Sequence, residues 1–215
     1  MSVNAVLLPT LIISFAFALG YGFMQGQRKN RLIAAEVAHS LEELYRPDDT
    51  RYVNIGGVVG YHIFYQLHGK VKSIVGTLTL LPRHAVLYMP ISRLLGRRDQ
   101  MRLTLHTTAL PFGEGHIVDP GALEKGILYL EDQESLQRRS VSLGERSFLI
   151  LYRNPMVADR LERFFAALPT VEGLHSFSLS RMERSYSVVA DPTPESLIPL
   201  IEGVQENLTL LELGY

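Results

Sequence analysis

The first 27 residues of this 215-residue chain contain no Asp, Glu, Lys or Arg, and every charged side chain lies after them. Residues 3–24 are almost purely apolar or small. A helix of that length rises about 33 Å, which is enough to cross a hydrocarbon core of about 30 Å. The pattern therefore predicts one transmembrane anchor at residues 1–27 and a separate domain at residues 28–215.

Positive charge follows the apolar segment directly, as Arg28, Lys29 and Arg31. By the positive-inside rule, such residues stay on the cytoplasmic side of a membrane. We therefore expect the N-terminus to lie outside or in a lumen, the domain to be cytoplasmic, and these three side chains to contact lipid headgroups. A cleaved signal peptide is the alternative, because Ala-Phe-Ala at residues 16–18 has the small-x-small pattern of a cleavage site.

Small residues recur at every fourth position of the apolar segment, as Ser14, Ala18, Gly22 and Gly26. Small side chains at this spacing allow a second helix to approach closely within a membrane. The stripe predicts helix–helix packing in the membrane. The alternative is that these residues have no such role, because Gly and Ala are frequent in membrane helices generally.

The charge of the chain is polarised along its length. The net charge of −1 indicates no overall attraction to DNA. Residues 28–102, however, contain 12 basic and 6 acidic side chains, whereas residues 103–215 contain 9 and 16. The basic half follows the predicted anchor, where it suits anionic lipid headgroups. The chain has no cysteine, which excludes disulfides, iron–sulfur clusters and thiol nucleophiles.

Hydrophobic periodicity predicts an α+β domain after the anchor, with helices packed on an antiparallel or mixed sheet. The domain is expected to be single or to consist of two packed halves, residues 28–110 and 120–215. Two helices should start with a cap residue and a proline, at Asn154-Pro155 and Thr193-Pro194. The expected helices are 31–45, a short one within 82–95, 155–168 and 194–208; the expected strands are 52–67 and 71–81 as a hairpin, 101–107, 126–131, 147–152, 174–181 and 185–190; residues 108–121 are expected as a loop, and the residues between 131 and 147 as a polar stretch.

No local pattern indicates catalysis, a metal site or a cofactor. None of the seven histidines occurs in an H-x-x-x-H or H-x-H spacing, and no G-x-S-x-G motif is present. The glycines at 56, 57 and 60 fit neither type of phosphate loop, so we expect them at a bulge or a close approach of the backbone. Catalytic residues need not be neighbours in sequence, so a membrane-tethered enzyme or small-ligand sensor remains the alternative function.

Four arginines lie within ten residues: Arg93, Arg97, Arg98 and Arg102. Guanidinium groups bind phosphates through two parallel hydrogen bonds, so this cluster could bind lipid headgroups or RNA. The alternative is a solvated connector whose arginines pair with the acidic C-terminal half of the chain.

The order of these segments resembles the calumin family. The shared features are an anchor helix, the basic segment Arg-Lys-Asn-Arg-Leu at 28–32, an amphipathic helix, a hairpin, and a unit from Leu81 to Thr107 with Asp99-Gln100 before its strand. Members of that family are coiled-coil-domain-containing proteins of the endoplasmic reticulum that take part in multipass membrane-protein biogenesis beside the translocon. The likeness extends over about residues 10–110.

This resemblance implies a membrane-anchored scaffold that assists membrane-protein insertion or assembly beside the translocon or ribosome. The lack of catalytic motifs favours a non-enzymatic protein. The four arginines would then face lipid, ribosomal RNA or a protein partner. Two family features have no counterpart in this sequence: an acidic lumenal segment before Val3 and a long charged tail after Tyr215. Calcium binding, which is associated with the acidic segment, is therefore not implied.

Overall fold

The computed structural model describes residues 3–124 and 135–213. It is an α+β fold with a long N-terminal helix, as the sequence predicts. Its elements are, in chain order, α1 (Val3–Tyr45), β1 (Asp49–Asn54), β2 (Gly60–Gln66), β3 (Val71–Thr79), α2 (Met89–Leu94), β4 (Gln100–Thr107), β5 (Gly115–Val118), α3 (Pro120–Glu124), β6 (Gln137–Leu143), β7 (Arg146–Tyr152), α4 (Pro155–Ala167), β8 (Leu174–Ser180), β9 (Ser185–Ala190), α5 (Pro194–Asn207) and the 3-10 helix η2 (Leu208–Leu211).

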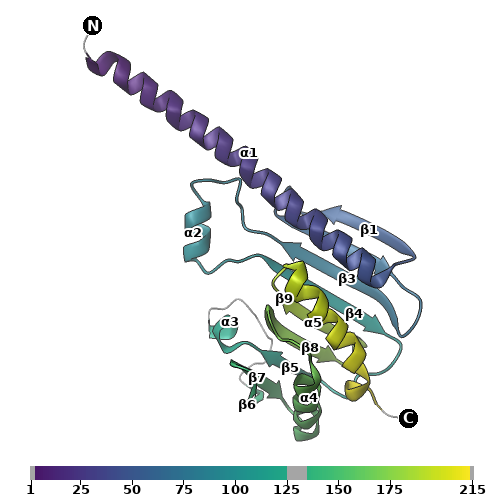
Figure 1. Cartoon of the computed structure of the whole chain (residues 1–215). Coiled ribbons are helices and arrows are strands. Elements are labelled where there is room, and N and C mark those ends of the chain that lie inside the picture. The colour runs from purple at the N-terminus through teal and green to yellow at the C-terminus, as the bar shows by residue number, and fades with distance from the viewer. Residues whose placement is uncertain (1–2, 125–134, 214–215) are drawn as a thin grey trace.

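The described residues form an antiparallel sheet of nine strands, in the order β1-β2-β3-β4-β9-β8-β5-β7-β6. The C-terminal half of α1, together with α5 and α4, covers one face of this sheet (Figure 1). Strand β4 pairs with β9, which joins the two expected halves of the chain. The halves therefore share one sheet and one hydrophobic core.

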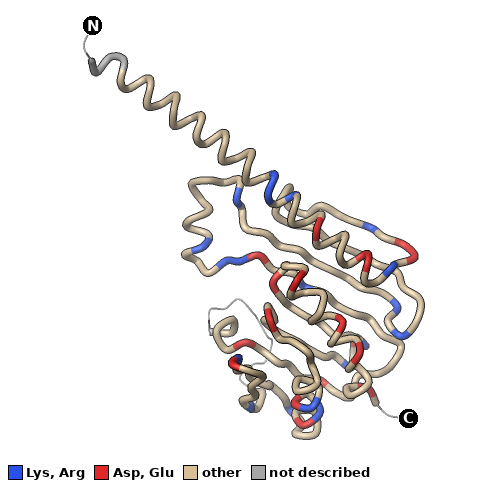
Figure 2. Tube along the Cα trace, viewed as in Figure 1, with Lys and Arg blue, Asp and Glu red and all other residues tan. Residues whose placement is uncertain are grey.

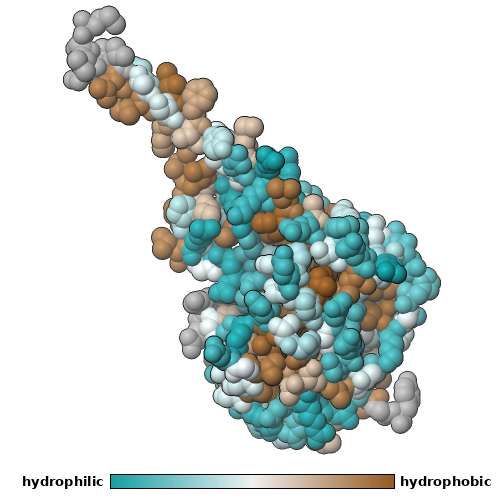
Figure 3. Space-filling view, viewed as in Figure 1, coloured by the Kyte–Doolittle hydropathy of each residue, from teal (hydrophilic) through white to brown (hydrophobic). Residues whose placement is uncertain are grey.

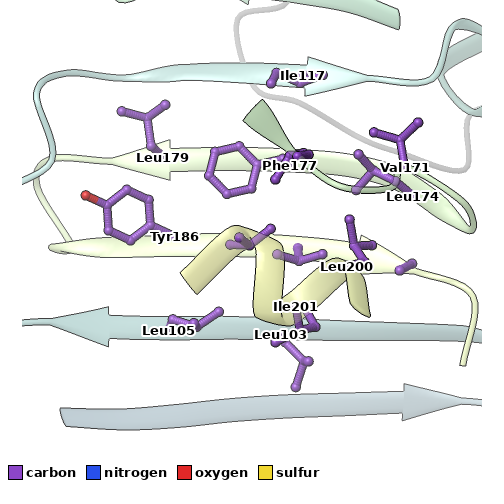
Figure 4. Packing of buried hydrophobic residues seen from close by; sticks show 14 of the residues in the cluster. Leu103, Leu105, Ile117, Val171, Leu174, Phe177, Leu179, Tyr186, Leu200 and Ile201 are labelled. Atoms are coloured by element: carbon purple, nitrogen blue, oxygen red, sulfur yellow. The ribbon is translucent and has the colours of Figure 1, made fainter. Parts of the chain in front are cut away.

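Alternation along the central strands builds that core. Leu103 and Leu105 of β4 point toward the helices, and Leu200 and Ile201 of α5 pack over them (Figure 4). Phe177 of β8 lies in the same layer and is almost fully buried. Burying side chains of this size stabilises the fold by about 1.5–3 kcal/mol each.

The predicted anchor and the predicted amphipathic helix form one continuous helix, α1, of 43 residues. Its large apolar side chains from Leu7 to Met24 are exposed except for the partly buried Leu19, whereas Val37 and Leu41 are fully buried against the sheet. By length and composition, α1 is a candidate membrane span among the described residues. The first half of the helix thus projects from the domain, and the second half belongs to its core.

The expected hairpin of residues 52–67 and 71–81 is wrong in its first strand, which the structure divides into β1 and β2. Gly57 adopts a φ of +63° in the turn between these two strands, a conformation that favours glycine. A Cβ at Gly60 would lie 2.9 Å from Cγ1 of Ile55, which confirms the expected close approach. The turn glycines therefore end one strand and start the next.

Two further strands lie in segments where we expected none. Strand β5 occupies part of the expected loop 108–121, and β6 occupies part of the expected polar stretch. Strand β5 has four residues between glycine- and proline-rich turns. Strand β6 is polar, and among the described residues it lies at the sheet edge and pairs with β7 alone. Both lack the apolar run that marks a strand in sequence. The expected strand 126–131 lies outside the described residues.

The predicted starts of the last two long helices are confirmed. The side chain of Asn154 accepts a hydrogen bond from the backbone N–H of Met156 at 2.9 Å, as an N-cap should. Thr193 occupies the corresponding position before α5 but makes no capping bond with its side chain. The short helix α2 begins beside Pro90 and stops before Gly96, whose φ of +74° favours glycine.

Candidate functional site

A buried polar network fastens α1 to the sheet domain just after its exposed apolar half. Asn30 is fully buried, and its amide donates a hydrogen bond to the backbone carbonyl of Leu81 at 2.8 Å. Arg83 donates to the Asn30 side chain at 2.9 Å and forms a two-pronged ion pair with Asp99. Asp99 also accepts the backbone N–H of Leu81 at 2.7 Å. These hydrogen bonds and the ion pair therefore fix the direction of α1 relative to the sheet.

Two glycines of α1 provide close contact with the loop that precedes α2. A Cβ at Gly26 would lie 2.3 Å from the backbone carbonyl atoms of Arg83, and one at Gly22 would lie 2.7 Å from Cγ2 of Val86. The close approach that we expected with a second helix is thus made within the chain at these positions. The other two residues of the stripe, Ser14 and Ala18, are exposed. Their packing against another helix stays a prediction.

A cleft of about 680 Å³ lies between α1, the connector from α2 to β4, and the start of α5. Its lining includes Arg93 of α2 and Arg97 and Arg98 of the connector. Figure 2 shows basic residues on α2, on this connector and at the point where α1 meets the domain. The other charged residues of the lining are the Arg83–Asp99 pair and three acidic side chains, Glu36, Asp191 and Glu195.

Unlike Arg83, the other three arginines of the cleft have no ion pair or side-chain hydrogen bond within the described part of the chain: Arg93, Arg97 and Arg98. Asp191, by contrast, binds Nε2 of the buried His175 at 2.9 Å. The acidic C-terminal half does contribute to the cleft, but the pairing that we considered as an alternative is not present among described residues. Three guanidinium groups are therefore available to a ligand.

Arg102 lies apart from the other three arginines. It alternates along β4 with Met101 and Leu103, which are buried beneath the helices. The side chain of Arg102 is exposed and belongs to the opposite face of the sheet. The structure therefore brings together Arg93, Arg97 and Arg98 and separates the fourth member of the predicted cluster.

The cleft is suited to holding an anionic group. Arginine binds carboxylate and phosphate with a planar fork of donors, and the adjacent acidic side chains would suit a cationic portion of the same ligand. No histidine lines the cleft among the described residues. In the same described part of the chain, no three His, Cys, Asp or Glu side chains are grouped to hold a metal ion.

Sequence reasoning did not find the acidic wall of this cleft. Glu36 belongs to a helix that starts at residue 3, whereas Asp191 and Glu195 flank the start of α5. The Thr193-Pro194 signal located that helix start but could not show which segment it faces. The segment that faces the start of α5 is determined by the pairing of β4 with β9, and these strands are more than 75 residues apart in sequence.

The three cations that follow the apolar segment lie on the exposed surface of α1. Arg28 and Lys29 are exposed, and Arg31 donates a hydrogen bond to the Gln27 side chain at 3.3 Å. Lys29 and Arg31 adjoin Asn30 in sequence and Arg28 lies two residues before it, so all three are at the level where the polar network begins. Their contact with lipid headgroups stays a prediction.

Comparison with known proteins gives little further information. No family model matches the chain, and no curated protein sequence matches it. Among solved structures, the mycobacterial trehalose monomycolate transport factor A, TtfA, is similar at a TM-score of 0.47 and 9% identity, over 83% of this chain and 98% of that one. At this level the similarity carries no argument about function. The resemblance to the calumin family stays a prediction.

Proposed function

We propose that this protein is a single-pass, membrane-anchored binding protein that assists membrane-protein insertion or assembly. Its cleft would bind an anionic group of a partner through Arg93, Arg97 and Arg98. The observation that carries this proposal is the set of three arginines that line one cleft without ion pairs among the described residues. A basic site with no ion-pair partner among the described residues is suited to an external anionic partner.

The anchor in this proposal is the exposed half of α1. Large apolar side chains such as Leu11, Phe17 and Met24 are more than half exposed, which is costly in water and favourable in lipid. The cations at 28, 29 and 31 follow at once and favour a cytoplasmic domain. The polar network around Asn30 then holds the cleft close to the membrane surface.

The proposed partners are translocon or ribosome components, or nascent membrane proteins. Ribosomal RNA and acidic protein segments both present anions that arginine recognises. The resemblance to the calumin family supports this partner class. The alternative function, a membrane-tethered enzyme or small-ligand sensor, calls for a deep apolar pocket with convergent histidine and carboxylate groups, and the polar arginine cleft favours binding instead.

Affinity purification from a mild detergent tests the proposal. The full-length chain should recover translocon or ribosome components, and the triple variant Arg93→Glu, Arg97→Glu, Arg98→Glu should lose them. Arg102→Glu is the matched control, because it reverses a neighbouring charge on the opposite face of the sheet. Equal recovery with the triple variant and the control would refute the assignment of the cleft, and recovery of the protein alone would refute the partner class.

A further inference from the structure

Several large apolar side chains in and around α2 are exposed to solvent. Leu94 is 87% exposed, more than any other large apolar residue of this segment. The segment is short and follows a loop that leaves the sheet beside α1 (Figure 1). The exposed apolar residues are Leu87, Tyr88, Ile91, Leu94 and Leu95, which we call the α2 patch.

The α2 patch lies level with the end of the exposed apolar half of α1. The loop that leads into α2 packs against α1 at Gly22 and Gly26, as the contacts of Val86 and Arg83 show. The ring of Phe23 also meets that of His84, with centroids 5.8 Å apart. These contacts lie at the end of the apolar half of α1, just before its first charge at Arg28. The patch is therefore held where the hydrocarbon core would give way to headgroups.

The chemistry of the patch matches that depth. Tyr88 is partly exposed, and tyrosine is enriched at the membrane–water interface. Arg93 and Arg97 are exposed next to the apolar side chains, where their cationic groups can meet anionic headgroups. Figure 3 shows hydrophobic surface on α1 and again in the region where Figure 1 places α2. Apolar side chains, an interfacial aromatic and flanking cations together characterise a segment that lies in the interface.

We propose that the α2 patch is a second membrane contact, which inserts its apolar side chains into the interface of the same bilayer that α1 crosses. This inference rests on the membrane anchoring in the proposed function. Two points of attachment would prevent the domain from rotating about α1. The arginine cleft, which shares Arg93 and Arg97 with this segment, would then open at the lipid surface.

The absence of cysteine permits a direct test with single-cysteine variants of the full-length chain. Leu94→Cys carries a nitrobenzoxadiazole probe in vesicles of phosphatidylcholine and phosphatidylglycerol, in which the phosphatidylcholine is brominated on its acyl chains. Met182→Cys is the matched control because Met182 is 89% exposed in the turn between β8 and β9. That turn adjoins the end of β4 remote from α2, about 24 Å along the strand. Phe15→Cys reports on the anchor.

We expect bromine to quench the probes at residues 94 and 15 and to leave the probe at 182 unquenched. Leu87→Cys provides an independent position within the α2 patch and should be quenched as well. If residue 15 is quenched and residues 94 and 87 behave like 182, the anchor stands and this inference is overturned. A blue-shifted probe at 94 without bromine quenching would show that another protein surface covers the patch, which also overturns it. If residue 15 is not quenched, the anchoring proposal fails and this inference fails with it.

Discussion

Replacement of Asp99 by alanine should be among the most destabilising single changes near the cleft. The side chains of Arg83 and Asp99 are 12% and 19% exposed. Removing one partner of a buried ion pair costs about 3–5 kcal/mol, because the remaining charge is left unpaired. The backbone N–H of Leu81 would also lose its acceptor, at a further cost of about 1–3 kcal/mol. Asn30 still contacts Arg83, and some solvent reaches the pair, so we expect less than the sum of these two costs, about 3 kcal/mol in total.

Thermal unfolding of the full-length chain in mild detergent, followed by circular dichroism, measures this effect. For a chain of this size, 1 kcal/mol shifts Tm by about 2–4 °C, so Asp99→Ala should lower Tm by about 6–12 °C. Asp159→Ala is the control, because it removes one partner of an exposed ion pair with Arg139 and should cost less than about 1 kcal/mol. A shift for Asp99→Ala no larger than that of the control would refute the structural role of the network.

Three further changes test other parts of the fold. Gly26→Ala should destabilise the chain by roughly 1–3 kcal/mol, because the added Cβ would meet backbone atoms of Arg83. Gly20→Ala is the control and should be tolerated, because a Cβ there has no described neighbouring atom outside its own helical turn within 4 Å. Equal Tm values for the two variants would contradict the packing of α1. Asn154→Ala should lower the free energy of unfolding, measured by urea titration, by about 1 kcal/mol, because it removes the N-cap of α4. An unchanged free energy of unfolding would contradict the capping hydrogen bond. Burial lowers the pKa of the His116 imidazole in the folded chain. As the pH falls, the unfolded chain therefore protonates this imidazole at a higher pH than the folded chain does. The free energy of unfolding should decrease as pH drops below about 6.5. His116→Gln should remove that part of the pH dependence, and an unchanged profile would exclude His116 as its source.

Sequence patterns located the elements that have strong local signals. The long apolar helix, α4 and α5 were predicted because an uncharged segment and Asn-Pro or Thr-Pro starts are local features. Strands β5 and β6 were missed because one is very short and the other is polar at a sheet edge. Their pairing with neighbouring strands is a tertiary interaction, which a local pattern does not contain.

The candidate site was predicted only in part for the same reason. The cluster from Arg93 to Arg98 is visible as a run of basic residues, but the separation of Arg102 depends on the alternation of β4. Asn30 lies within the basic segment 28–32, where no local pattern indicates that its side chain is buried. Its burial follows from the position of Arg83 beneath α1, which is a contact over more than 50 residues of sequence.

The membrane topology is the most direct test of the account, because the cleft acquires its proposed role only at a cytoplasmic membrane surface. Met182→Cys can be labelled with a membrane-impermeant maleimide in vesicles of both orientations. We expect the protein to resist extraction by alkaline carbonate. Residue 182 should react in vesicles with the cytoplasmic side outward but not in right-side-out vesicles. Release by carbonate, or labelling in right-side-out vesicles alone, would contradict this topology.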